Sequence, residues 1–277
     1  MRVAYLGPPG TVSDEALTAA APDADAVPLA TLRDVVLSVQ EGRIERALVP
    51  VENALEGGVD PVLDALALEA PDVALIGEVV QPVSYCLAAG RELALDEITM
   101  VRSHPQALGQ CKGWLQANLP RAAVVPAAST ADAVRDVAQD GSGTHAAIGP
   151  RLAARRYGAV MLAEDLEDDP GNATRFAWVA QASDAPAPPE RGPAKTILVF
   201  WGAGSGASGW LVSCLAVFAF AGINLTRIES RPLRQGMGEY MFFLDLEASM
   251  ADPAVVGAVQ GLRRHADMVR VLGSFET

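Results

Sequence analysis

A proline-rich segment near residue 190 constrains this chain most, because it separates two parts with different patterns. Residues 183–193 read Ser-Asp-Ala-Pro-Ala-Pro-Pro-Glu-Arg-Gly-Pro and have no periodic apolar face. Such a sequence predicts an extended tether instead of a helix or strand. The chain of 277 residues therefore divides into a domain over residues 1–182, a linker over 183–194 and a smaller domain over 195–277.

The two domains have different predicted element orders. Strand and helix patterns alternate from residue 3 to residue 180, which is typical of α/β domains. The smaller domain predicts strand 195–202, helix 210–221, strand 225–233, strand 239–246, helix 253–265 and strand 268–275. This βαββαβ order indicates a split βαβ sandwich with both helices on one sheet face. Its sheet edges would be covered by pairing with a second copy, so we expect a homodimer or homotetramer.

Residues 172–176, Asn-Ala-Thr-Arg-Phe, place a hydroxyl and a guanidinium at the start of an apolar strand predicted over 176–180. Thr174 and Arg175, with the neighbouring asparagine, offer donors that a core does not need. The segment predicts an anion site, although a polar cap before an edge strand would have the same composition.

A glycine-containing turn follows the first apolar run, at residues 3–6. Residues 7–16 read Gly-Pro-Pro-Gly-Thr-Val-Ser-Asp-Glu-Ala and lead into a helical pattern with Thr11 and Ser13 at its start. This layout points backbone N–H groups at a negatively charged ligand. Any tight strand-to-helix turn also recruits these residue types.

Two further segments carry polar residues at strand ends. Glu52 and Asn53 follow the strand predicted over 47–51, where open α/β sheets bind ligands, or they belong to an ordinary polar loop. After the strand predicted over 98–101, Ser103 can cap a helix, and Gln106 and Gln110 share one helix face. Pro105 suits the first helical turn. His104 reads as structural.

Residues 128–132, Ala-Ser-Thr-Ala-Asp, form a capping pattern after the strand predicted over 122–126. For Ser129 and Thr130 a cap and a functional role are equally good interpretations.

In this order, the five segments resemble the prephenate dehydratase family over nearly the whole chain. The resemblance extends to residues 222–232, Gly-Ile-Asn-Leu-Thr-Arg-Ile-Glu-Ser-Arg-Pro, which are similar to the ligand segment of the ACT regulatory domain. It implies a two-lobed α/β catalytic domain with a cleft between lobes of about residues 1–77 with 162–182, and 78–161. It also implies conversion of prephenate to phenylpyruvate, for phenylalanine biosynthesis, with no metal or organic cofactor.

The resemblance also implies roles for individual residues. Thr174 would assist the leaving hydroxyl, and Glu52 is the other candidate acid; the sequence leaves this choice open. The substrate would be oriented by Ser13, Asn53, Ser103, Gln110 and Arg175. The effector site would comprise Gly209, Trp210, Leu211, Asn224, Leu225, Glu229, Ser230, Arg231 and Pro232. Arogenate dehydratase and a non-catalytic amino-acid sensor are the alternatives.

One position departs from the family. Where related ACT domains have Pro-Gly-Ala-Leu, this chain has Ser208, Gly209, Trp210 and Leu211. We expect the indole either to fill part of the effector pocket or to turn into the subunit interface. Overfilling a fitted site costs about 1–3 kcal/mol, so we expect weak phenylalanine sensing or a shift to another effector.

Composition excludes several partners. With 34 acidic and 21 basic residues the net charge is −13, which argues against nucleic acid and anionic membranes. Positive potential for an anionic substrate must then come from helix N-termini and a few arginines. The three separated cysteines suggest neither disulfides nor zinc. The apolar run over 210–223 is too short to span a bilayer and predicts a buried helix. The N-terminus shows no signal peptide, so we expect a cytoplasmic protein.

Overall fold

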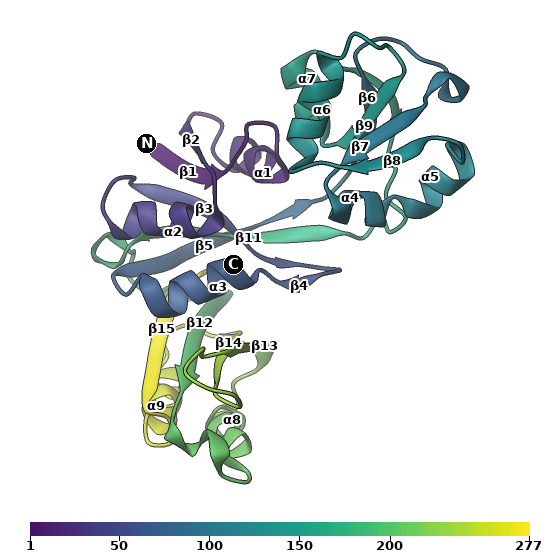
Figure 1. Cartoon of the computed structure of the whole chain (residues 1–277). Coiled ribbons are helices and arrows are strands. Elements are labelled where there is room, and N and C mark those ends of the chain that lie inside the picture. Colours follow the sequence, from purple (N-terminus) through teal and green to yellow (C-terminus); the bar gives the residue numbers. More distant parts are fainter. The chain divides into compact units, whose positions relative to one another are not determined.

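The computed structural model describes residues 1–277, apart from the side chains of Ala203 and Ser205. The chain forms two compact units, and Figure 1 labels the helices and strands that they contain. The first comprises Met1–Val35, Leu48–Gly57 and Val79–Phe176. The second comprises Val36–Ala47, Gly58–Glu78 and Ala177–Thr277. Three β-sheets run through these units.

The first sheet contains the N-terminal strands. Its order is β2 (Asp25–Leu29), β1 (Arg2–Leu6), β3 (Arg46–Asn53), β11 (Ala173–Gln181) and β5 (Val73–Pro82), and the short β4 (Gly57–Gly58) pairs with β3. β1 and β2 are parallel. The associated helices are α1 (Val12–Ala20), α2 (Leu32–Gln40) and α3 (Asp60–Asp64), which continues into a π-helical turn, η1 (Ala65–Glu69).

Local chemistry explains these helices. The Thr31 hydroxyl accepts a hydrogen bond from Asp34 N at 3.1 Å and so begins α2. Val35, Val36 and Val39 are fully buried, and their spacing places them on one helix face.

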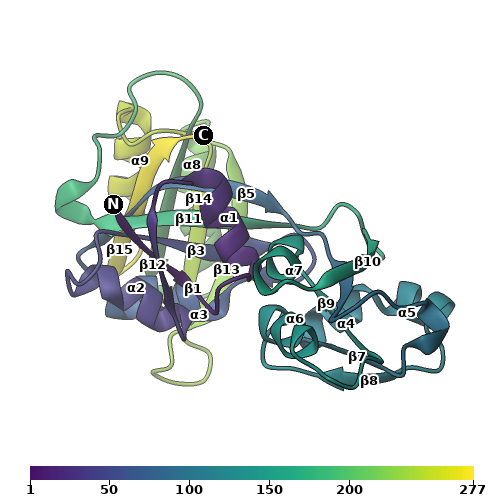
Figure 2. The same ribbon diagram turned by 90° about the horizontal axis from the view of Figure 1, so that it is seen from above.

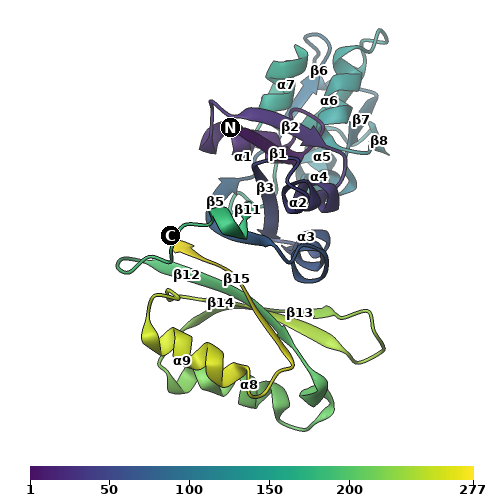
Figure 3. The same cartoon turned by 90° about the vertical axis from the view of Figure 1, so that its left-hand side faces the viewer.

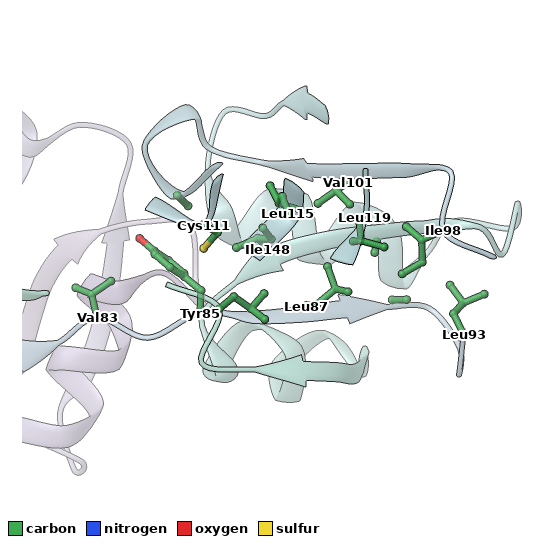
Figure 4. Close-up of a cluster of buried hydrophobic side chains, with 14 residues drawn as sticks. Val83, Tyr85, Leu87, Leu93, Ile98, Val101, Cys111, Leu115, Leu119 and Ile148 are labelled. Carbon is green, nitrogen blue, oxygen red and sulfur yellow. The ribbon is translucent and has the colours of Figure 1, made fainter. Parts of the chain in front are cut away.

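The second sheet has the order β10 (Val160–Glu164), β6 (Cys86–Ala89), β9 (His145–Gly149), β7 (Met100–Ser103) and β8 (Ala123–Pro126). Both faces of this sheet are covered by hydrophobic clusters, and alternate residues of β6 point to opposite faces. Leu87 and Ala89 pack with α4 (Pro105–Gln110) and α5 (Lys112–Asn118) in the cluster of Figure 4. Cys86 and Ala88 pack with α6 (Thr130–Ala138) and α7 (Arg151–Tyr157), which lie side by side (Figures 1 and 2).

The third sheet confirms the predicted βαββαβ order. Its strands follow the order β13 (Leu225–Pro232), β14 (Tyr240–Leu246), β12 (Ala194–Trp201) and β15 (Met268–Glu276), with antiparallel neighbours. The helices α8 (Trp210–Phe220) and α9 (Pro253–Leu262) cover one face (Figure 3). Short 3-10 turns η3 (Ala182–Asp184) and η4 (Ala203–Gly206) flank β12.

The prediction that α8 is a buried helix was only half right. Cys214 and Phe218 are fully buried, but Val212 is 71% and Phe220 91% exposed. The sequence is apolar on every side of α8, so it cannot show which side faces the sheet.

Two strand boundaries also differ from the prediction. The segment before β7 forms a 3-10 turn, η2 (Leu95–Glu97), in which Ala94 N donates to the Glu97 carboxylate at 2.8 Å, so the strand begins only at Met100. β11 begins at Ala173 because Ala54 N already donates to Ala173 O at 2.9 Å. Thr174 and Arg175 therefore lie within the strand.

Candidate active site

The glycine turn after β1 positions the start of α1. Thr11 is the N-cap: its hydroxyl accepts from Asp14 N at 3.3 Å and donates to Leu6 O at 2.9 Å. The buried Asp14 carboxylate accepts from Gly10 N at 2.7 Å. Gly10 has φ +92°, and an added Cβ would lie 3.1 Å from Ala153 Cα, so only glycine fits there. Ser13, in the first turn of α1, is buried.

A cavity of about 490 Å³ lies where α1 and α6 begin. Ser129 caps α6, since its hydroxyl accepts from Asp132 N at 2.9 Å. The Asp132 carboxylate pairs with Arg135 at 2.6 Å. Two capped helix N-termini at one cavity favour an anionic ligand. The cavity is lined by Leu6, Gly7, Pro8, Thr11, Val12, Ser13, Ala30, Tyr85, His104, Gln106, Ala107, Ala128, Ser129, Thr130 and Asp132.

The predicted cap of α4 was wrong by one residue. His104 is the N-cap, and its Nδ1 accepts from Gln106 N at 3.3 Å. Pro105 occupies the first helical position as predicted. Ser103 is fully buried at the end of β7, and its hydroxyl donates to Ile148 O at 2.6 Å. Ser103 therefore links β7 to β9 and does not line this cavity.

A buried amide network joins the ends of β3 and β11 to α4. Asn53 Nδ2 donates to Thr174 Oγ1 at 2.9 Å and to Asn172 Oδ1 at 3.0 Å, while Asn53 Oδ1 accepts from Leu55 N at 3.1 Å. Asn172 Nδ2 donates to Gln110 Oε1 at 3.0 Å. Because Thr174 accepts the bond from Asn53, its own hydroxyl proton is available for a ligand.

This network reaches a second cavity, of about 380 Å³. Gln106 lines both cavities, and Gln110 Nε2 is buried without a hydrogen-bond partner among the described residues. The second cavity is lined by Leu55, Glu56, Pro105, Gln106, Gly109, Gln110, Glu167, Asp168, Asp169 and Asn172. Asp168 accepts from Gly113 N at 2.8 Å, and this contact fixes the start of α5.

Glu52 and Arg175 form an ion pair with each other. Glu52 Oε2 accepts from Arg175 Nε at 3.0 Å and from Nη2 at 2.8 Å. Arg175 thus braces the neighbouring strands β3 and β11 through the Glu52 carboxylate. Neither residue lines the two cavities.

Cys111 borders this region but is chemically unreactive. It is fully buried, and burial, followed by the charges of Glu167 and Asp168, raises the pKa of its thiol to about 12. A thiol that stays protonated is a poor nucleophile. Among the described residues, no group of histidine, cysteine, aspartate and glutamate could hold a metal ion.

The structure corrects one of the two expectations for Trp210. The indole does not face outward: it is 9% exposed in the core of its own domain, and its ring lies 5.9 Å from Phe200 and 6.0 Å from Phe242. Trp210 Nε1 donates to His265 O at 2.6 Å. An indole placed at the first turn of α8 can reach this partner because Gly204 leaves room beside it.

The predicted effector segment in β13 contacts α3 within the second unit. Arg231 pairs with Asp64 at 3.1 Å and also with Asp60, and Arg234 pairs with Asp64 as well. Glu229 lies against Gly58, where an added Cβ would be 2.8 Å from its carboxylate. Asn224 Nδ2 donates to Glu247 at 2.8 Å.

The fold defines a two-lobed α/β protein joined to a βαββαβ domain, and the N-termini of α1 and α6 meet at one of its cavities. No helix among the described residues is long and apolar enough to cross a membrane. The family model described as prephenate dehydratase matches residues 3–184. The chain belongs to the prephenate dehydratase family.

Individual relatives agree with this assignment. A prephenate dehydratase of Mycolicibacterium vanbaalenii is 38% identical over 99% of this chain and 91% of its own length. An Arabidopsis thaliana protein named arogenate dehydratase/prephenate dehydratase 2 is 36% identical over 99% of this chain and 72% of its own. The structure of prephenate dehydratase from Arthrobacter aurescens in complex with L-Phe has a TM-score of 0.91 and 35% identity, and the match covers 100% of this chain and 90% of that one.

Proposed function

We propose that this protein is a lyase that converts prephenate to phenylpyruvate, carbon dioxide and water. One observation carries the proposal. The N-termini of α1 and α6 meet at the first cavity, and Gln106 lines both this cavity and the second one, which the amide network of Thr174 reaches. The cavity suited to an anion is thus linked, through the hydrogen-bonded amides, to a hydroxyl whose proton is available, while Thr174 itself lines neither cavity. Prephenate carries carboxylates and a ring hydroxyl, which matches this pairing of groups.

The reaction needs orientation and one proton. The bond from the ring to its carboxylate breaks, and its electron pair enters the ring. The bond to the hydroxyl opposite breaks and its electron pair leaves with the oxygen, which takes up one proton from the solvent and departs as water. Aromaticity drives both steps, so the protein has to hold the substrate and assist the leaving hydroxyl.

We assign assistance of the leaving hydroxyl to Thr174. Asn53 orients the threonine by occupying its acceptor side, which turns the O–H bond outward. A threonine hydroxyl is a weak acid, so its contribution is a preorganised hydrogen bond or a proton relay. Glu52 acts less directly, because its Oε2 is held by Arg175.

Substrate orientation falls to Ser13 and Gln110, which line the cavities, and to Asn53, which lines neither and acts through its hydrogen bonds. Ser13 lines the first cavity and Gln110 the second, where its buried Nε2 offers a donor. Asn53 contributes through Thr174 and Asn172. Ser103 is left out of this set, because its hydroxyl is already bonded to Ile148 O.

The relatives leave the choice of keto or amino substrate open, since the plant relative is named for both arogenate and prephenate. We favour prephenate because the Mycolicibacterium vanbaalenii relative, at 38% identity, is named prephenate dehydratase. The acidic residues of the second cavity would attract the ammonium group of arogenate, which makes arogenate the second candidate.

We further propose that the C-terminal domain binds phenylalanine at Gly209, Leu211, Asn224, Leu225 and the segment Glu229, Ser230, Arg231 and Pro232. The support is the L-Phe complex of the Arthrobacter aurescens relative. Because the Trp210 indole packs in the domain core, we expect it to leave this site open to phenylalanine. Arg231 would transmit binding to α3 through Asp60 and Asp64.

The remaining proposals concern assembly and location. We propose a homodimer or homotetramer, supported by the edge strand β13 of the third sheet. We also propose that it works in the cytoplasm. Light scattering after gel filtration measures the assembly directly. A monomer at all concentrations would contradict it.

Incubation of the purified protein with prephenate tests the proposed activity. We expect phenylpyruvate to form at a rate proportional to enzyme concentration. Binding of prephenate without phenylpyruvate would establish the sensor alternative instead. Parallel incubation with arogenate, followed by detection of phenylalanine, ranks the two substrates by kcat/KM.

A further inference from the structure

Tyr85 lines the first cavity, although it belongs to none of the sequence motifs. It lies between β5 and β6 and is 5% exposed. Its ring packs in the cluster that contains Leu87, Cys111 and Ile148, while the residue also lines the cavity where α1 and α6 begin. Figure 4 shows the hydroxyl at the end of the cluster, pointing away from Leu87 and Ile148.

The backbone fixes Tyr85 on both sides. Its N–H donates to Glu167 Oε2 at 2.9 Å, and its C=O accepts from Leu166 N at 3.2 Å. Two residues earlier, Val83 N donates to Asn172 O at 3.0 Å, which ties this segment to the Thr174 network. A side chain held in this way can be placed with the precision that catalysis needs.

The Tyr85 phenol is a neutral donor. Burial raises its pKa, and nearby Cys111, Glu167 and Glu56 raise it further. Its hydroxyl makes no hydrogen bond to any described residue of the chain. A phenol that is nine-tenths buried and faces a cavity is matched to a ligand acceptor.

The surrounding charges select the kind of acceptor. Glu56 and Glu167 lie near the phenol, and they would repel a substrate carboxylate. The carboxylates are better placed at the N-termini of α1 and α6. A neutral oxygen therefore suits Tyr85, and prephenate has a hydroxyl.

We propose that Tyr85 donates a hydrogen bond to the leaving hydroxyl of the substrate and is a catalytic residue, an inference that rests on the proposed function. The hydroxyl oxygen has two lone pairs, so a bond from Tyr85 leaves one lone pair for the bond proposed from Thr174. Each donor stabilises the negative charge that develops as the carbon–oxygen bond breaks. Tyr85 transfers no proton in this step.

Tyr85→Phe keeps the ring and removes the donor. We expect kcat for prephenate to fall about a hundredfold, the scale of one lost transition-state donor. The affinity for phenylpyruvate, which lacks the leaving hydroxyl, should stay within about twofold of the wild type. Thermal stability should not fall, since the hydroxyl has no protein partner to lose. Tyr240→Phe, at a tyrosine 42% exposed on β14, is the matched control and should leave kcat unchanged.

Each other outcome overturns a specific statement. Wild-type kcat in Tyr85→Phe would remove the hydroxyl from the reaction. A loss of phenylpyruvate affinity equal to the loss of kcat/KM would show that Tyr85 holds a carboxylate. A wild type that forms no phenylpyruvate would overturn the proposed function, and the role of Tyr85 with it.

Discussion

Replacing Thr174 with valine separates catalysis from stability at the centre of the site. Thr174 is 8% exposed, and its hydroxyl accepts one bond, from Asn53 Nδ2 at 2.9 Å. In the variant the Asn53 amide still has Asn172 Oδ1 at 3.0 Å and Ala173 O at 3.3 Å. The loss is therefore one buried hydrogen bond, about 1 kcal/mol, which lowers Tm by about 2–4 °C.

The effect on turnover should be much larger. Loss of the donor to the leaving hydroxyl should lower kcat by about two orders of magnitude or more, which is at least about 2.7 kcal/mol at 1.36 kcal/mol per tenfold change. The assay is the initial rate of phenylpyruvate formation, with Tm from thermal unfolding. Thr174→Ser is the matched control, because it keeps the hydroxyl and should retain most of the activity. Near wild-type kcat in Thr174→Val would refute the assignment.

Four further results are expected from changes elsewhere in the chain. Glu52→Gln should lower kcat by about tenfold or less, since glutamine still offers an oxygen to its arginine partner; a loss as large as that of Thr174→Val would instead make Glu52 the acid. Asp64→Asn should weaken phenylalanine inhibition by about fivefold or more at nearly unchanged basal activity, because Arg231 loses a charged partner; inhibition curves that coincide with the wild type would exclude this link. The Cys111 thiol has an ordinary pKa of 9.0 and a folded pKa of about 12, so its contribution to stability is present below pH 9 and is lost as the pH rises toward 12; Cys111→Ala should flatten this alkaline loss in urea unfolding. Trp210→Ala should destabilise the C-terminal domain by about 3–5 kcal/mol. If the variant is instead as stable as its parent and more sensitive to phenylalanine, the indole fills part of the effector pocket.

Local sequence signals predicted most of the elements. The βαββαβ order of the C-terminal domain follows from apolar periodicity, and the cap at Ser129 follows from its pattern with Asp132. Glycine, proline and hydroxyl residues at a strand end similarly predicted the start of α1. These signals act within a few residues along the chain, so they can be read without the fold.

Contacts between distant segments could not be predicted in this way. Ser103 looked like a cap, but Ile148 O lies beside it in the folded sheet and takes its hydroxyl, leaving the cap to His104. Trp210 is placed by Phe200 and by two residues far from it in sequence, Phe242 and His265. Tyr85 stands between two apolar strands and reads as core, although its hydroxyl reaches a cavity.

The pairing of Glu52 with Arg175 shows the same limit. Both residues stand out in the sequence as candidates for substrate contact, because each is polar and close to a strand end. Only the pairing of β3 with β11 in the folded sheet shows that Glu52 and Arg175 form an ion pair with each other. The lobe boundaries implied by the resemblance stay a prediction, although the second sheet extends through β10 to Glu164, past residue 161.

The most direct test of the central claim is one reaction with prephenate labelled with ¹³C in the ring carboxylate. Labelled carbon dioxide and unlabelled phenylpyruvate are quantified together during turnover by the wild-type protein. We predict equal amounts of the two products, formed at the same rate and both reduced by about two orders of magnitude or more in Thr174→Val. Bound prephenate that releases no labelled carbon dioxide above the uncatalysed rate would contradict the assignment of this site as a dehydratase.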